Sequence, residues 1–261
     1  MDHKNEMVSV IIPVYNAENF ITETIDCVRR QSYQDWELLL IEDSSTDLTM
    51  EVMTAYLEEI QDNRIRLVKR EIKSLEDKRF GAAKARNLGI SLARGRYIAY
   101  LDADDRWRED KLELELAFLK DKQAGFVFSG YEFGDEEARG TGKVVHVPGE
   151  LNYGQALANT TIFSSTVMMD TEKIGKSLME MPYIKSEDTA CWWKILRSGV
   201  TAYGLDENLV IYRRAGKTLS SNKLEAIRRI WNLYRQAEGL SVPESIRCFV
   251  FWAFRAVRRR V

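Results

Sequence analysis

The chain has 261 residues, of which 45% are hydrophobic and 30% charged, and a formal net charge of -2 at pH 7. This composition is typical of a globular protein and excludes a chain that is mainly disordered. The length allows one large α/β domain or two small ones. No apolar run approaches the ~20 residues that a membrane-spanning helix needs.

The first part of the chain alternates predicted strands with predicted helices. Residues 8–16 form a continuous, mostly β-branched run, which is typical of a strand buried on both faces of a parallel sheet. Apolar residues at three- and four-residue spacing predict a helix over 18–31. A second strand is predicted over 36–41, and it ends in acidic residues ahead of a helix that reaches Gln61.

The same alternation continues to the fourth predicted strand. A short strand over 65–69 is followed by a charged segment over 70–79 and by a helix over 81–93 that Gly95 closes. The aromatic-rich run at 97–101 is the next strand. This order predicts an α/β fold with a Rossmann-like, mostly parallel central sheet flanked by helices.

Polar residues follow several of these strands. Ligands of doubly wound sheets bind at the carboxyl ends of the strands, and Tyr15, Asp43 and Asp102 are expected at that edge. No GxGxxG follows the first strand and no GxxxxGK[ST] occurs in the chain, which disfavours a dinucleotide dehydrogenase or a P-loop NTPase. A bound phosphate would therefore have to be met by a metal ion.

The acidic stretch Asp102, Ala103, Asp104, Asp105 is the predicted centre of the chemistry. Carboxylates about 4 Å apart repel by roughly 4 kcal/mol at an effective dielectric near 20. A hard cation, Mg²⁺ or Mn²⁺, held by one or two of these acids and by substrate phosphate oxygens would relieve that repulsion. The alternative is a solvated turn in which Asp104 or Asp105 caps the next helix.

The second half of the chain has a less regular pattern. A helix is predicted over 108–122 and strands over 126–128, 166–169 and 208–212. The glycine- and charge-rich segment over 134–143 is expected to be an exposed hairpin or loop.

A second acidic pair lies at the start of a predicted helix. With Ser186 as N-cap, Glu187 and Asp188 fall in the first turn, where the helix dipole favours acids by ~0.3–1 kcal/mol. That placement alone could explain them. Alternatively, one of the two takes a proton from a substrate hydroxyl, a role typically worth ~10²–10⁴ in rate.

The C-terminal region is basic. Residues 213–221 carry three cations, a glycine and three hydroxyls, and they could fold over an anionic ligand or serve only as a linker. Helices are predicted over 223–237 and 245–260, and from residue 225 onward there are eight arginines and three glutamates. The last helix could lie in an anionic bilayer interface or pack on the domain. No nucleic acid partner is expected, because acids at the sheet edge would repel its phosphates.

The cysteines and the N-terminus indicate the compartment. Cys27, Cys191 and Cys248 are far apart and without CxxC spacing, so we expect reduced core thiols rather than disulfides or zinc ligands. Residues 1–6 are polar and do not open a secretory signal. The expected location is cytoplasmic, with a peripheral position on the inner face of the cell membrane through 245–261.

Six short motifs, in order, resemble the family 2 glycosyltransferases with the GT-A fold, and above all the bacterial enzymes that assemble teichuronic acid, capsule or O-antigen chains. The motifs are VSVIIPVYN at 8–16, IEDSSTD at 41–47, GAAKARNLGI at 81–90, YLDADD at 100–105, SED at 186–188 and YR at 212–213. The resemblance implies a GT-A domain over 1–221 with a C-terminal helical extension over 222–261. Within the domain it implies a nucleotide-binding half over 7–107 and an acceptor-binding half over 108–221.

The resemblance also implies roles for single residues. Those implied to bind the donor are Pro13, Tyr15, Glu18, Asp43, Gly81, Arg86, Asn87, Asp102, Ala103, Arg213 and Ser220. Asp43 would read a uracil-type base, Asp102 would meet the ribose and Asp104 would hold the metal ion against the diphosphate. Asp188 would be the general base of an inverting transfer.

Further residues are implied to surround the substrates. Trp192 would lie near the acceptor, and Tyr212 would belong with Arg213 and Ser220 to a loop that closes over the donor. Many members of the family carry a histidine soon after the Tyr-Arg pair, whereas residues 214–217 contain none.

The function implied is a metal-dependent inverting transfer from a UDP-sugar to a hydroxyl of a glycan or lipid-linked acceptor in cell-surface polysaccharide synthesis. Cations would stabilise the negative charge that develops on the leaving diphosphate. Two alternatives stay open, a nucleotidyltransferase-like enzyme and a non-catalytic nucleotide-sugar-binding partner of an assembly complex. The donor sugar, the acceptor hydroxyl and the oligomeric state, including whether the chain forms oligomers at all, are not predicted.

Overall fold

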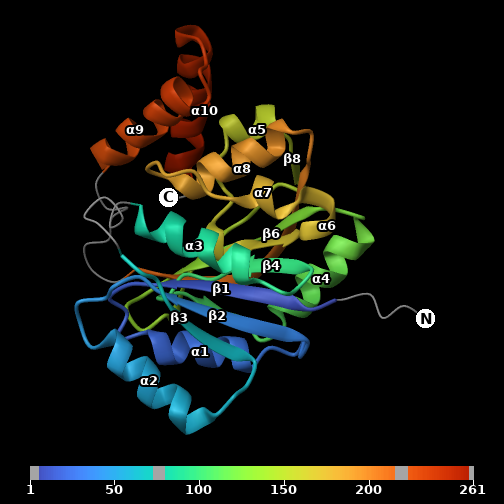
Figure 1. Ribbon diagram of the computed structural model, residues 1–261. Helices are drawn as coiled ribbons and strands as arrows, with labels where there is room; N and C mark the ends of the chain where they lie inside the picture. Colours follow the sequence, from blue (N-terminus) through green and yellow to red (C-terminus); the bar gives the residue numbers. More distant parts are fainter. Residues whose placement is uncertain (1–5, 73–79, 215–222, 259–261) are drawn as a thin grey trace.

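In the computed structural model, which describes residues 6–72, 80–214 and 223–258, one ten-stranded sheet lies between two layers of helices (Figure 1). Its first four strands are β1 (Val8–Val14), β2 (Trp36–Glu42), β3 (Ile65–Lys69) and β4 (Tyr97–Tyr100). They pair in parallel in the order β3-β2-β1-β4. The chain order therefore reverses between β1 and β4, which is where doubly wound sheets bind their ligands. The predicted Rossmann-like arrangement is confirmed.

The sheet continues into the second half of the chain with mixed directions. Its strands are β5 (Arg106–Trp107), β6 (Phe126–Gly134), β7 (Gly140–Val145), β8 (Glu150–Leu151), β9 (Val167–Asp170) and β10 (Ala202–Arg213). Strand β9 is antiparallel to both β4 and β6, so it joins the two halves into one sheet. Strand β10 pairs in parallel with β6, and the short strands β5 and β8 pair antiparallel with β10. Strand β7 pairs antiparallel with β6 as a hairpin.

Helices cover both faces of the sheet (Figure 1). One layer consists of α1 (Ile21–Arg29), α2 (Thr49–Ile60) and α4 (Lys111–Asp121). The other consists of α3 (Gly81–Leu92), α5 (Tyr153–Leu157), α6 (Thr171–Ile174), α7 (Lys176–Met179) and α8 (Glu187–Arg197). The C-terminal elements α9 (Lys223–Asn232), a π-helical turn (Leu233–Ala237) and α10 (Val242–Arg258) pack on this second layer, where Tyr234 stacks on Trp193 with ring centroids 5.4 Å apart.

The burial of both sheet faces explains why the first strands are continuous apolar runs. Successive side chains of a strand point to opposite faces. In β1, Val10 and Ile12 pack with the layer of α1, α2 and α4, whereas Ile11 packs with the layer of α3 and α8. Most positions of β1 are therefore apolar, and the buried Ser9 is satisfied by a hydrogen bond to Glu37 of β2.

Some predicted boundaries are wrong because residues pair with distant segments. Helix α4 begins at Lys111 rather than at residue 108, since Arg106 and Trp107 pair with β10 and Arg108 N donates to Leu209 O at 2.9 Å. Neither Asp104 nor Asp105 caps this helix. Strands β6 and β10 are longer than predicted. The segment at 134–143 is the expected hairpin: it joins the end of β6 to the first residues of β7.

Two expectations about the core and the membrane can be compared with the described residues. The three cysteines are free and buried, as reduced core thiols should be. Within residues 6–72, 80–214 and 223–258, no helix combines the length and the apolar character needed to span a bilayer.

On strand β2, a buried carboxylate fixes the turn that leads into β4. Glu37 is 1% exposed and accepts hydrogen bonds from Ser9 Oγ at 2.7 Å and from Arg94 N at 2.6 Å. Burial, the largest effect, raises the pKa of Glu37, but the hydrogen bonds from Arg94 and Ser9 outweigh it and hold the pKa below its ordinary value.

We predict that Glu37→Gln lowers the free energy of unfolding at pH 7 by about 1–3 kcal/mol, because buried donors lose a charged acceptor. Because folding lowers this pKa, its contribution is full above about pH 4.5 and is lost as the pH falls through the folded value. Urea unfolding from pH 7 to pH 3 should therefore show the gap between the two proteins closing in acid. Glu51→Gln, at an exposed position of α2, is the control and should change the free energy of unfolding little at any pH in this range. A constant gap would contradict this role.

Candidate active site

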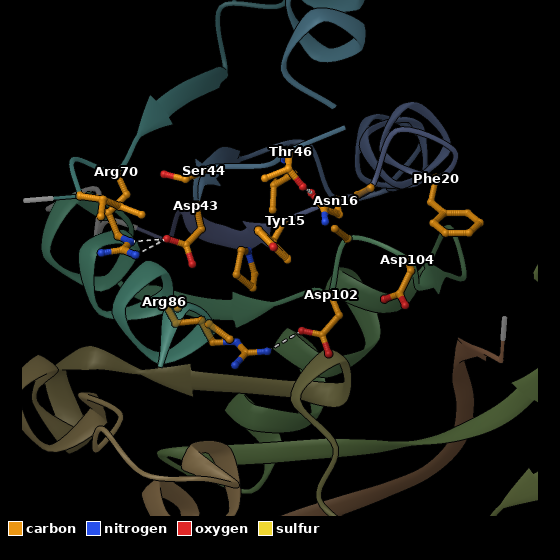
Figure 2. A pocket seen from close by; sticks show the side chains of 17 residues that line it. Tyr15, Asn16, Phe20, Asp43, Ser44, Thr46, Arg70, Arg86, Asp102 and Asp104 are labelled. Carbon is orange, nitrogen blue, oxygen red and sulfur yellow. Dashed lines mark hydrogen bonds and ion pairs between the residues drawn. The ribbon is translucent and has the colours of Figure 1, made fainter. Parts of the chain in front are cut away.

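A cavity of about 610 Å³ lies at the carboxyl ends of β1, β2 and β4 (Figure 2). Its lining residues are Pro13, Val14, Tyr15, Asn16, Ala17, Phe20, Asp43, Ser44, Thr46, Arg70, Ile72, Gly81, Ala82, Arg86, Asp102, Ala103 and Asp104. They come from the loops after the first four strands and from the start of α3. The carboxyl edge of the sheet, where the sequence predicted a ligand site, therefore contains one cavity.

At one side of the cavity, Asp43 is paired with a buried arginine (Figure 2). Asp43 follows β2 and Arg70 follows the neighbouring β3, and two nitrogens of the guanidinium bind Asp43 Oδ1. A Cβ atom at Gly81 would collide with Asp43 Oδ2, so glycine is required there for α3 to start so close to the carboxylate. Burial, the largest effect, raises the pKa of Asp43, and the charge of Arg70 does not cancel it.

The loops after β1 and β2 are tied to each other at the rim of the cavity. Asn16 adopts a left-handed backbone conformation with φ 50°, and its Oδ1 accepts a hydrogen bond from Thr46 N at 2.8 Å. Asn16 N donates to Ser45 Oγ at 3.1 Å. The adjacent Tyr15 is 57% exposed, so its ring is available for stacking on a planar ligand.

The acids after β4 occupy three different environments. Asp105 is fully buried, accepting a hydrogen bond from Ser165 Oγ at 2.6 Å and one from Arg213 N at 3.2 Å. Burial, followed by the charges of Asp102 and Asp104, raises the pKa of Asp105 well above its ordinary value. Asp105 therefore anchors the turn, whereas Asp102 and Asp104 line the cavity.

The environment of Asp104 suits a bound cation. Burial, and then the charge of Asp102, raises the pKa of Asp104 to about 6. In the parts of the chain that the structure describes, no three His, Cys, Asp or Glu side chains are grouped so that they could hold a metal ion. One or two carboxylates are the protein ligands that Mg²⁺ uses when substrate phosphates and water complete its shell, and Asp104 with Asp102 fits that donor set.

A buried arginine connects the cavity to helix α8. Arg86, on α3, is 5% exposed, with Nη2 2.6 Å from Asp102 Oδ1 and Nη1 3.1 Å from Glu187 Oε1. Burial would lower the pKa of Arg86, but the nearby carboxylates, Asp102 foremost, outweigh it and hold the pKa above its ordinary value. Burial, and then the charge of Asp188, raises the pKa of Glu187. One cation therefore holds acids from two separate segments.

Asp188 lies beside the cavity without lining it. It is half-buried in the first turn of α8, where Oδ1 accepts a hydrogen bond from Thr189 N at 2.6 Å. Its Oδ2 is 3.4 Å from Ser164 Oγ. The next residue, Ser165, accepts from Asp102 N at 3.0 Å, so the short helical turn at Ser164–Thr166 contacts both acidic segments.

Three other predicted site residues bind protein groups instead of lining the cavity. Glu18 Oε2 accepts from Leu48 N at 2.8 Å, ahead of α2. Asn87 is bound to both backbone groups of Met181, at 2.9 Å and 2.7 Å. Arg213 is 3% exposed, and its Nε donates to Asp104 O at 2.7 Å. Each of these three residues therefore holds a backbone segment near the cavity in place.

The implied positions of residues around the substrates need correction. Trp192 is 2% exposed, and its ring lies 5.9 Å from Tyr100 and 5.3 Å from Phe126, so it is a core residue and cannot contact an acceptor. Tyr212 and Arg213 belong to strand β10, not to a loop. Ser220, the remaining predicted donor-binding residue, lies outside the described residues.

Sequence reasoning missed several residues of the site. In the sequence Arg70 is only the first residue of a charged segment, although a residue directly after a strand next to β2 should lie near Asp43. The pairing of Glu187 with Arg86 and the contacts of Ser165 had no sequence signal, because each partner is distant in the chain.

A second cavity, of about 850 Å³, lies between α8 and α9. Its wall includes Ala190 and Lys194 of α8 and Leu224 and Arg228 of α9. Phe80 lines this cavity and the next residue, Gly81, lines the first one. The two cavities therefore adjoin at the start of α3.

Comparisons with known proteins agree with this geometry. A model of the family described as glycosyl transferase family 2 matches residues 9–173. The chain is 40% identical over 262 residues, the full length of both proteins, to a Bacillus subtilis (strain 168) protein named as the teichuronic acid biosynthesis glycosyltransferase TuaG. It is 32% identical over 252 residues to the Escherichia coli protein named UDP-Glc:alpha-D-GlcNAc-diphosphoundecaprenol beta-1,3-glucosyltransferase WfaP, covering 97% of this chain and 94% of that protein.

A solved structure supports the fold. The mannosyltransferase PcManGT from Pyrobaculum calidifontis, in complex with GDP-Man and Mn2+, matches with a TM-score of 0.68 and 20% identity. The match covers 95% of this chain and 69% of that one. At this identity the likeness concerns the fold alone.

We predict that Arg86→Met lowers the free energy of unfolding by about 3–5 kcal/mol, since it leaves two carboxylates without their shared cation. Arg86→Lys should also lower the free energy of unfolding, but by less than Arg86→Met. An ammonium group keeps the positive charge but cannot bind Asp102 and Glu187 through two separate nitrogens. Urea unfolding measures both effects. Arg30→Met, which removes a 60% exposed guanidinium 3.7 Å from Asp26, is the control and should cost less than about 1 kcal/mol. An Arg86→Met protein as stable as wild type would contradict the bridging role.

Proposed function

This chain belongs to glycosyl transferase family 2 and is a glycosyltransferase, and we propose that it transfers a sugar from a UDP-sugar to a hydroxyl of a lipid-linked glycan with inversion. Its fold is the GT-A fold expected from the sequence. The names of the two relatives, one for teichuronic acid synthesis and one for transfer from UDP-Glc to a diphosphoundecaprenol-linked sugar, support a role in cell-surface polysaccharide synthesis. The cytoplasmic location stays a prediction.

One observation carries the donor proposal. A single cavity contains a paired carboxylate at one side, an exposed aromatic ring at its mouth and two acids at the other side. We assign the base to Tyr15 and Asp43, where stacking and hydrogen bonding are both available. The ribose is assigned to Asp102 and the diphosphate to the region of Asp104. The nucleotide-binding half would then be residues 7–107.

Asp104 is the proposed metal ligand, with Asp102 beside it. The raised pKa of Asp104 supports this assignment, because a carboxylate that burial and a neighbouring acid destabilise gains most from a nearby cation. Bound Mn²⁺ or Mg²⁺ would stabilise the charge that develops on the leaving diphosphate.

Asp188 is the proposed general base, in the acceptor-binding half over 108–221. Among the described residues, Asp188 Oδ2 has only the long 3.4 Å contact with Ser164 Oγ, so this oxygen can accept the proton of a substrate hydroxyl. Arg86 and Ser165 hold the start of α8 next to the acids after β4. We assign the base and the leaving diphosphate to opposite sides of the transferred sugar, because a single displacement with inversion requires it.

The family match disfavours a nucleotidyltransferase. A non-catalytic nucleotide-sugar-binding partner remains the second candidate, and it differs from the enzyme in which acids it needs. It would need Asp104 for binding but would not need Asp188.

Thermal unfolding tests the donor and metal assignment. UDP at about 100 times its Kd should add ~2.7 kcal/mol of stability, and with it several degrees of Tm, but only with Mn²⁺ or Mg²⁺ present. Asp104→Asn should lose this increase, and Asp121→Asn, at an exposed position on α4, should keep it. Equal stabilisation by UDP in the presence of a chelator would contradict the metal role.

Steady-state kinetics tests Asp188. Asp188→Asn should show the wild-type Tm increase with UDP and metal, yet transfer sugar ~10²–10⁴ times more slowly, because the amide cannot take the proton. The assay would follow UDP release from a panel of UDP-sugars with polyprenyl-diphosphate-linked acceptors. Wild-type turnover in this variant would remove Asp188 as the base.

A further inference from the structure

The C-terminal helices carry most of the exposed apolar surface of the described residues. Across 6–72, 80–214 and 223–258, eleven large hydrophobic side chains are exposed, and seven of them lie in α9 and α10. The seven are Leu224, Ile227, Val242, Ile246, Val250, Phe251 and Phe254. Scattered exposed apolar residues need no explanation, but a concentration of this kind marks an interaction surface.

Helix α10 is apolar on two sides. Phe249 and Trp252 pack against the core cluster that contains α8, and Trp252 Nε1 donates to Thr160 Oγ1 at 2.9 Å. This side holds the helix on the domain. Val250 and Phe254, 59% and 66% exposed, lie one turn apart on another side of the helix. Since one apolar side is enough for docking on the domain, the second is open to a partner.

The charges of α10 point to the chemistry of that partner. Glu244 is the one acidic residue in the sequence of this helix, and it lies in the first turn. Arg247 is four residues before the exposed Phe251, and the segment at 255–260 contains four arginines in the sequence. Exposed apolar residues bordered by arginines are the pattern of helices that lie in the interface of an anionic bilayer.

We propose that α10, together with the exposed side of α9, lies flat on an anionic phospholipid surface. Ile246, Val250 and Phe254 insert at the level of the lipid headgroups and upper acyl chains, and Arg247 faces the lipid phosphates. The described helices are too short or too polar to cross the bilayer, so the contact is confined to one leaflet. The docking does not depend on the transfer reaction.

A second copy of the chain is a less suitable occupant. A two-fold contact places the same surface against itself, so both copies would bring the positive charge of Arg247 into one interface. An anionic bilayer instead supplies the opposite charge.

The proposed membrane surface adjoins the reaction centre. Leu224 and Arg228 of α9 line the cavity of about 850 Å³ whose facing wall includes Ala190 of α8. Helix α8 begins with Glu187 and Asp188. Docking through the C-terminal helices therefore brings lipid close to the helix that carries the proposed base, and a lipid-linked acceptor could be used without leaving the bilayer.

Co-sedimentation of the full chain with vesicles tests the proposal. Wild type should pellet with vesicles of equal parts phosphatidylcholine and phosphatidylglycerol, and much less with phosphatidylcholine alone. The double variant Val250→Ser with Phe254→Ser should bind about tenfold more weakly or worse, because two inserting side chains are lost. Leu48→Ser, which removes a 62% exposed apolar side chain next to α2, is the matched control and should bind like wild type. Arg247→Glu should reduce the preference for anionic vesicles.

Two further measurements keep the outcome clear. The Tm and the UDP-induced increase in Tm should be the same in every variant, since the altered side chains are exposed. Vesicle binding in a protein that UDP does not stabilise would support the docking while contradicting the transfer reaction. Equal binding by the double variant and wild type, or no binding of wild type to anionic vesicles, would overturn the proposal. A vesicle-free dimer that the double variant dissociates would overturn it in favour of a second copy.

Discussion

The ion pairs of Arg86 hold the candidate site together. Its buried guanidinium joins Asp102, after β4, to Glu187, at the start of α8, so the sheet edge and two helices share one cation. Asp104 lies two residues after Asp102 and Asp188 directly follows Glu187, and Arg86 alone cannot neutralise four carboxylates. A half-buried group of acids with too little positive charge around it is costly by itself, but it is suited to a substrate that arrives with a cation. The same constraint fixes the separation between the donor cavity and the proposed base.

The environment, not the residue type, separates the roles of the acids in this site. Within one turn, Asp105 is buried as an anchor, Asp102 is paired with Arg86, and Asp104 lines the cavity with a raised pKa. Other residues support the site without lining the cavity. Arg213 binds the backbone of Asp104 from strand β10, so the second half of the chain shapes the wall of a cavity that the first half lines.

The parts of the structure that follow from local pattern could be predicted from the sequence. The first four strands are short and mostly apolar, because both faces of the sheet are covered, and the rule for parallel sheets then places Asp43 and Asp104 at one edge. The errors arise where long-range pairing decides. The start of α4 moves because β5 pairs with β10, and Arg70 reaches Asp43 through the register of β2 with β3. Trp192 faces the core, which a motif in sequence cannot reveal.

A crystal structure with UDP and Mn²⁺, with anomalous scattering recorded at the manganese edge, tests the central claim most directly. The account predicts an anomalous peak at the carboxylate of Asp104, the uracil beside Tyr15 and Asp43, and the diphosphate on the side of the cavity that adjoins Arg86 and α8. A peak remote from Asp104, or a nucleotide bound outside this cavity, would contradict it.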